Sequence, residues 1–202
     1  MQENQTRAQR LLQQKISKMS ASLQEAATKG ELKFADGFYY KSYALPTGAS
    51  GLQDILLNDD SQKDGYCSIS KQKLNPGCAF MADRMTIGIY SVATSSLGSN
   101  DEGTVSYAPV SAATAVPALQ NAEIEFTVNG IRQFMAPLTA FNQETIYGNS
   151  AKEGINFSAP VFINDEQLLQ FRLHLPQGKA LDSTLSVFIK VCIFGSECRI
   201  SR

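Results

Sequence analysis

The segment AEIEFTVNGIRQF, residues 122–134, decides the fold class. Apolar and polar residues alternate along its first half, and the apolar face consists of Ile124, Phe126 and Val128. Asn129 and Gly130 follow, and both tolerate the positive φ angles that a two-residue type I′ turn requires. An alternating segment, a tight turn and a returning segment together predict an antiparallel β-hairpin.

The same period of two recurs on both sides of this hairpin. It is clearest in residues 80–93, 167–175 and 185–195. We count about eight strands, each apolar on one face, and such strands need a second sheet to cover that face. The connections are long and uneven, which favours a jelly roll over an up-and-down barrel. The sequence therefore predicts an all-β protein, an eight-stranded antiparallel β-sandwich of jelly-roll type.

The chain before this body has a helical period instead. We expect residues 1–31 to form an amphipathic α-helical arm and residues 32–202 to form the sandwich domain. The arm carries a narrow apolar stripe made by Leu12, Ile16, Met19, Leu23 and Ala26. Gly30 is placed to end the helix. Such a stripe has to lie on the body of the protein, on a partner chain or on a membrane surface.

Composition limits the partners. The 202 residues are 43% apolar and 18% charged, with a net charge of −1, which argues against nucleic-acid binding through phosphate neutralisation. We expect neither a secretory signal nor a transmembrane segment, because the best apolar run, VFIKVCIF, is short and is interrupted by Lys190.

Several residue types in the chain are candidates for chemical sites. The four cysteines, at positions 67, 78, 192 and 198, are interpreted as reduced thiols, with a Cys67–Cys78 or Cys192–Cys198 disulfide as the alternative. His174 is the single histidine and is interpreted as a surface residue. No nucleotide-binding or metalloprotease motif is present, so we expect no cofactor.

Two groups of acidic residues could in principle do chemistry. Asn58, Asp59, Asp60 and Asp64 form an oxygen-rich stretch, but their spacing departs from a calcium loop and predicts a solvated loop. Glu123 and Glu125 share one face of a strand, as paired glycosidase carboxylates would, and an exposed strand produces the same pattern. We therefore expect the protein not to be an enzyme.

The chain resembles the single jelly-roll capsid proteins of tailless icosahedral phages and small viruses. The resemblance is carried by the arm TRAQRLLQQKISKMSASL, the strand FMADRMTIGIYSVA, the hairpin AEIEFTVNGIRQF, and the closing pair QLLQFRLHL and LSVFIKVCIFG. It implies a structural virion protein that assembles with copies of itself and with other virion proteins. The arm is only mildly basic, which favours a protein neighbour or an internal membrane as its partner over the genome.

The expected contacts follow from the same features. They are the stripe residues Leu12, Ile16, Met19 and Leu23, together with Phe188 and Phe194 on the second apolar face of the last strand. A strand that is apolar on both sides lies either under a covering layer or in a subunit contact. The alternative function is a receptor- or glycan-binding head of a trimeric adhesin or spike, with its contact face in loops 95–121 and 142–154.

Overall fold

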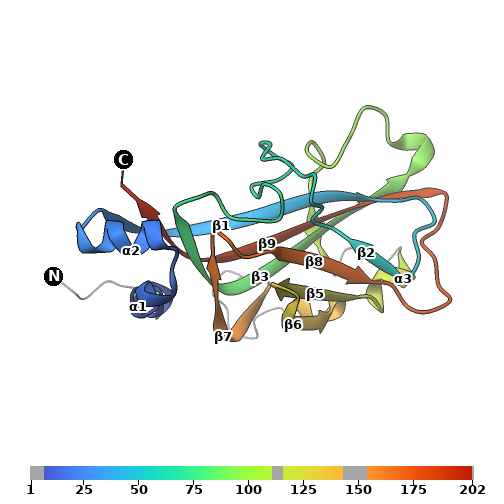
Figure 1. Ribbon diagram of the computed structural model, residues 1–202. Coiled ribbons are helices and arrows are strands. Elements are labelled where there is room, and N and C mark those ends of the chain that lie inside the picture. The colour runs from blue at the N-terminus through green and yellow to red at the C-terminus, as the bar shows by residue number, and fades with distance from the viewer. Residues whose placement is uncertain (1–6, 111–115, 143–153, 202) are drawn as a thin grey trace, which may run out of the picture.

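Two antiparallel β-sheets pack face to face in the computed structural model, which describes residues 7–110, 116–142 and 154–201 (Figure 1). The predicted all-β sandwich is confirmed. The strands are β1 (Leu32–Leu45), β2 (Leu52–Asp54), β3 (Cys78–Ala93), β4 (Ala108–Pro109), β5 (Glu123–Val128), β6 (Ile131–Pro137), β7 (Ile155–Asn164), β8 (Leu169–His174) and β9 (Leu185–Ile200).

The strands pair in a nested order. The larger sheet has the order β1-β9-β3, with both β4 and β7 paired to β3, and the smaller sheet has the order β2-β8-β5-β6. Apart from the two-residue β4, the first strand pairs with the last, the second with the second to last, and β3 with β7, down to the β5–β6 hairpin. Every one of these pairs is antiparallel.

The hairpin that decides the fold class is present as predicted. Val128 pairs with Ile131, which leaves a two-residue turn. Asn129 and Gly130 have φ angles of 51° and 73°, the left-handed values of a type I′ turn. The apolar face points into the core, where Ile124 and Phe126 are fully buried.

The last strand, β9, lies in the middle of the larger sheet between β1 and β3. Its inner face enters the core between the sheets through Val187, Ile189, Val191 and Ile193. Strand β3 contributes Met85, Ile87 and Ile89 to the same core, as the alternation predicted. The central position of β9 explains its apolar sequence, since a central strand is covered on both faces.

The arm differs from the single helix that the stripe predicted. It consists of α1 (Arg7–Gln14), a 3₁₀ turn η1 (Ile16–Lys18) and α2 (Ala21–Thr28). The break comes at Ser20, whose backbone N–H binds Asn164 Oδ1 at 3.3 Å and whose hydroxyl donates to Asp165 Oδ2 at 3.3 Å. These tertiary hydrogen bonds replace the ones a continuous helix would make. Gly30, with a φ of 72°, follows the end of α2 as expected.

The arm covers its own sheet. Leu12 and Leu23 are fully buried and Met19 is 4% exposed, in one cluster with Ala79, Met81 and Cys198 on the outer face of the larger sheet. Figure 1 shows both helices at one end of the sandwich, beside the C-terminus. Of the three surfaces on which the stripe could lie, the body of the protein is thus the one it contacts. None of the helices in the described ranges has the length and apolarity needed to cross a bilayer.

Loop segments cover the outer face of the same sheet at its other end. Tyr107 lies so close to Gly88 of β3 that a Cβ atom there would come within 2.8 Å of the Tyr107 Cβ. Lys190 of β9 lies 4.6 Å from the Tyr40 ring and 5.6 Å from the Tyr107 ring. Between the helices and these loops, one region of the outer face stays uncovered, and we call it the window.

Candidate functional site

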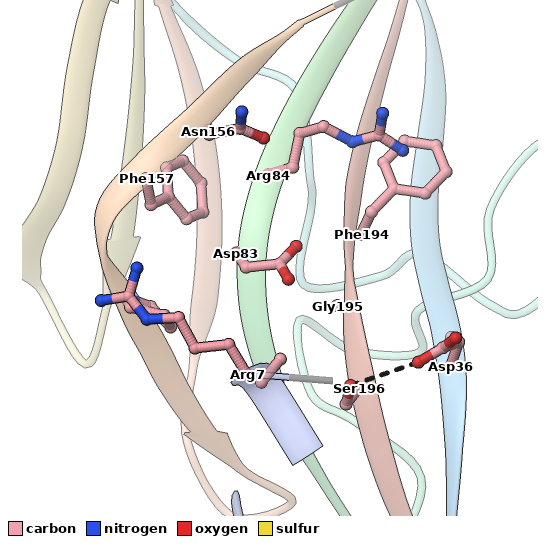
Figure 2. A pocket seen from close by; sticks show the side chains of 12 residues that line it. Arg7, Asp36, Asp83, Arg84, Asn156, Phe157, Phe194, Gly195 and Ser196 are labelled. Atoms are coloured by element: carbon pink, nitrogen blue, oxygen red, sulfur yellow. Dashed lines mark hydrogen bonds between the residues drawn. The ribbon is translucent and has the colours of Figure 1, made fainter. Parts of the chain in front are cut away.

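The window contains a hollow of about 500 Å³, which we call the bulge hollow (Figure 2). Its wall combines residues of α1, β1, β3, β7 and β9. The polar side chains among them are Arg7, Asp36, Asp83, Arg84, Asn156 and Ser196, and the larger apolar ones are Phe157, Pro160 and Phe194.

An extra residue in β3 aims two charged side chains into the bulge hollow. Ala82 pairs with Gly195 and Arg84 pairs with Phe194, so Asp83 stands outside the register as a β-bulge. Ala82 and Met85 on either side both point into the core. Asp83 and Arg84 therefore project together from the outer face, as Figure 2 shows.

Strand β7 opens the other side of the bulge hollow. Its pairing to β3 passes from Val161 at Ala82 directly to Asn156 at Arg84. Residues 157–160 are thus outside the ladder, and the two strands separate between the flanking pairs. The bulge hollow exists because both strands lose register at the same place.

The charges of the bulge hollow are balanced. Arg7 and Arg84 carry two positive charges, and Asp36 and Asp83 carry two negative ones. The Arg84 guanidinium lies 4.4 Å from the centre of the Phe194 ring, an attractive cation–π contact. Asp36 Oδ1 accepts long hydrogen bonds of 3.4 Å from Gln9 and from Ser196.

Sequence reasoning missed this site except for Phe194. Its residues come from five separate elements, and no motif links them. One signal was available: core alternation runs through Phe80 and Ala82 and then resumes at Met85 and Ile87, one residue late. That shift of period places a bulge at Asp83 and Arg84.

The outer face of the smaller sheet carries a second polar cluster. Glu125 Oε1 accepts one hydrogen bond from Arg132 Nε at 2.9 Å, and Glu125 Oε2 lies 2.7 Å from His174 Nε2. Its pKa is held below the ordinary value, chiefly by the Arg132 hydrogen bond, against the opposing effect of burial. The prediction of an exposed Glu125 was wrong: only 6% of the residue is exposed, because the long side chains of β6 and β8 lie across the central strand β5.

The carboxylate pair considered for glycosidase chemistry is therefore split. Glu123 is exposed, whereas Glu125 is buried in an ion pair with Arg132. His174 remains at the surface with 33% of its side chain exposed, but it is engaged with Glu125. The two carboxylates therefore differ in environment and do not form the symmetric pair that a glycosidase uses.

A buried carboxylate marks the end of the core under the helices. Glu197 is 4% exposed and receives two hydrogen bonds of 2.6 Å from Arg199 and one of 2.7 Å from the Tyr39 hydroxyl. Burial, followed by the charge of Glu197, raises the pKa of the Cys78 thiol to about 12. This cluster is compact and internally paired, which suits a structural role.

The four cysteines are free thiols, as predicted. Cys192 and Cys198 lie six residues apart on one extended strand, a separation of roughly 20 Å that no disulfide can bridge. Cys67 donates to the Ile69 carbonyl oxygen at 3.0 Å. Burial is the largest cause of the raised pKa of every one of these thiols.

The acidic stretch at 58–64 is used for local structure. Asp60 forms an ion pair with Lys41 and accepts the Leu57 N–H at 2.7 Å. Within the described residues, no group of three or more potential ligands could hold a metal ion.

The residues predicted to contact partner molecules differ in location and exposure. Leu12, Met19 and Leu23 face their own sheet, and Ile16 packs at the margin of the same cluster. Phe188 is 4% exposed, with the Tyr90 ring 6.1 Å away. Phe194 is partly exposed in the bulge hollow and stacks on Phe38, 56% of which is exposed.

The loops assigned to the alternative function are only partly described, since residues 111–115 and 143–153 lie outside the described ranges. In comparisons with known proteins, no family model, no curated protein and no solved structure matches the chain.

Proposed function

We propose that the protein is a structural component of a virion shell, assembled from copies of itself through the edges of its sandwich. The nested pairing of the strands supports this proposal. A long hairpin rolled into two sheets pairs its strands in that order, and we infer from it the jelly-roll wiring that the resemblance to capsid proteins implies.

The observation that carries self-assembly is the outer edge of β1. This strand ends the larger sheet. Around Tyr40 its edge is capped, because the Tyr40 backbone bonds Ser68 and the Ser42 N–H bonds the Tyr66 carbonyl oxygen. The alternation of hydrogen bonds along an antiparallel strand then directs the backbone groups of Phe34, Asp36 and Phe38 to the same outer side. Among the described residues, no strand pairs with β1 there.

An uncapped edge is a template for pairing with another chain. Phe38, the most exposed aromatic ring on this edge at 56%, would be covered by such a partner. Continuous pairing of β1 with a neighbouring copy extends the sheet across the subunit boundary, which is a rigid connection suited to a shell.

The test compares Phe38→Ala with Phe38→Pro. Alanine removes only the ring, whereas proline also removes the N–H that faces the open edge, a change that edge strands tolerate. We expect the wild-type chain to form large closed particles or rings in light scattering and negative-stain images, Phe38→Ala to assemble less, and Phe38→Pro to stay monomeric. A wild-type chain that is monomeric at all concentrations would overturn the proposal, and a discrete trimer would favour the adhesin head instead.

A further inference from the structure

The bulge hollow has a chemistry that selects its ligand. Its polar groups include strong donors, the guanidinium groups of Arg7 and Arg84, and strong acceptors, the carboxylates of Asp36 and Asp83. The amide of Asn156 supplies both kinds. A ligand that uses several groups of this wall has to offer both acceptors and donors.

Charge excludes the simpler ligands. A phosphate or sulfate attracted by Arg7 and Arg84 would share the hollow with two carboxylates, and a cation attracted by the carboxylates would share it with two guanidinium groups. A neutral ligand meets neither repulsion. A hydroxyl group donates one hydrogen bond and accepts others, so a row of hydroxyls can bridge a carboxylate to a guanidinium or an amide.

Shape and the apolar part of the wall narrow the class further. A hollow of about 500 Å³ falls within the range of small-molecule sites. Pro160 and Phe194, both partly exposed, provide apolar surface against which the C–H groups of a sugar ring can pack. Figure 2 shows Asp83 and Arg84 rising from one strand, with Asn156 on the neighbouring strand near Arg84 and the Arg7 guanidinium below them, over β7.

We propose that the bulge hollow binds a neutral saccharide, with Asp83, Arg84 and Asn156 contacting its hydroxyl groups. Asp36 of β1 belongs to both the hollow and the open edge, but Asp83, Arg84 and Asn156 lie on β3 and β7, away from that edge, and a monomer contains all of them. Saccharide binding and shell assembly can therefore fail independently. In a virion protein, the site would attach the particle to a neutral glycan.

The experiment is saturation-transfer NMR on the full chain with the methyl glycosides of glucose, galactose, mannose and N-acetylglucosamine as probes. Sialic acid and inorganic phosphate are tested in the same way as anionic comparison ligands. A monosaccharide has about twelve heavy atoms, so we expect a dissociation constant on the order of 1 mM for the preferred glycoside. The anions should neither bind more tightly nor displace it.

Variants then locate the site. Asp83→Asn removes a charged acceptor and should weaken binding roughly tenfold or more. Asn156→Ala changes an exposed side chain on β7 and should weaken it several-fold, which keeps the test valid if Asp83→Asn disturbs the bulge. Glu123→Gln, an exposed acid on the other sheet, should leave binding unchanged.

Three results would overturn the proposal. They are the absence of saturation transfer from all four glycosides, tighter binding of phosphate or sialic acid than of any glycoside, and glycoside binding that neither Asp83→Asn nor Asn156→Ala weakens.

Discussion

Gly195 lies against the backbone of Met81 so closely that a Cβ atom on Gly195 would overlap the Met81 carbonyl oxygen. This contact lies in the ladder beside the bulge, where Gly195 pairs with Ala82 and β3 carries its extra residue. The two strands can approach at this point only because one of them lacks a side chain. The floor of the bulge hollow thus depends on a glycine whose φ is ordinary and whose requirement is space.

We predict that Gly195→Ala destabilises the protein by about 3 kcal/mol or more, because the obstructing atom belongs to the backbone and cannot rotate away. Gly178→Ala is the matched control: Gly178 has a φ of 70° but no atom within 4 Å of its Cβ position, so only backbone strain of about 1 kcal/mol is expected. Urea unfolding of both variants measures the difference. Equal losses would show that the strands near Gly195 move apart at little cost.

The packing of the arm gives a second prediction. Leu12 is fully buried between α1 and the larger sheet, so Leu12→Ala should cost about 3 kcal/mol. Ile16 is only partly buried in the same cluster, and Ile16→Ala should cost about 1 kcal/mol. Thermal unfolding provides the comparison. If Leu12→Ala leaves the melting temperature unchanged, the helices do not belong to the folded body and are available to a partner or a membrane.

The Glu125 cluster predicts a pH dependence. The pKa of Glu125 is lowered from 4.5, chiefly by the hydrogen bond from Arg132, so its stabilising effect is present above that pH and is lost as the pH falls through the folded-state pKa. Glu125→Gln should therefore cost about 2 kcal/mol at pH 6 and progressively less as the pH falls below 4.5.

Melting temperatures of wild type and Glu125→Gln between pH 3 and 7 test this. Glu123→Gln changes an exposed acid two residues away on the same strand and should follow the wild-type curve. A constant difference between wild type and Glu125→Gln across that range would contradict the ionic role of Glu125.

Two ion pairs of similar length should contribute unequally. Arg199 holds the buried Glu197 carboxylate through two bonds of 2.6 Å, and Lys29 holds the exposed Glu25 through one bond of 2.6 Å. Arg199→Ala leaves a carboxylate buried without its cation, and because Arg199 itself is largely exposed we expect a loss of roughly 2 kcal/mol. Lys29→Ala should have no measurable effect on the free energy of unfolding, because solvent screens this exposed pair. Guanidinium unfolding of the two variants decides whether burial of the acid sets the difference.

Much of the fold could be predicted from local pattern. Period-two alternation identified the strands that form the core, and Asn129-Gly130 identified the hairpin, because both signals depend on neighbours in the sequence. The single long helix was wrong for the complementary reason. Ser20 leaves the helix to bond Asn164 and Asp165, residues more than 140 positions away, and no local propensity records such partners.

The sequence by itself determined that this chain forms alternating strands with an apolar stripe before them, since side-chain periodicity is a local property that burial then selects. Only the tertiary structure decided where the stripe lies, that Glu125 is buried, and that Arg7, Asp83 and Asn156 surround one hollow. These outcomes depend on which distant strands become neighbours and on where two of them lose register. Strand pairing and register are set by the free energy of the whole sandwich. They therefore cannot be predicted from any single segment of the chain.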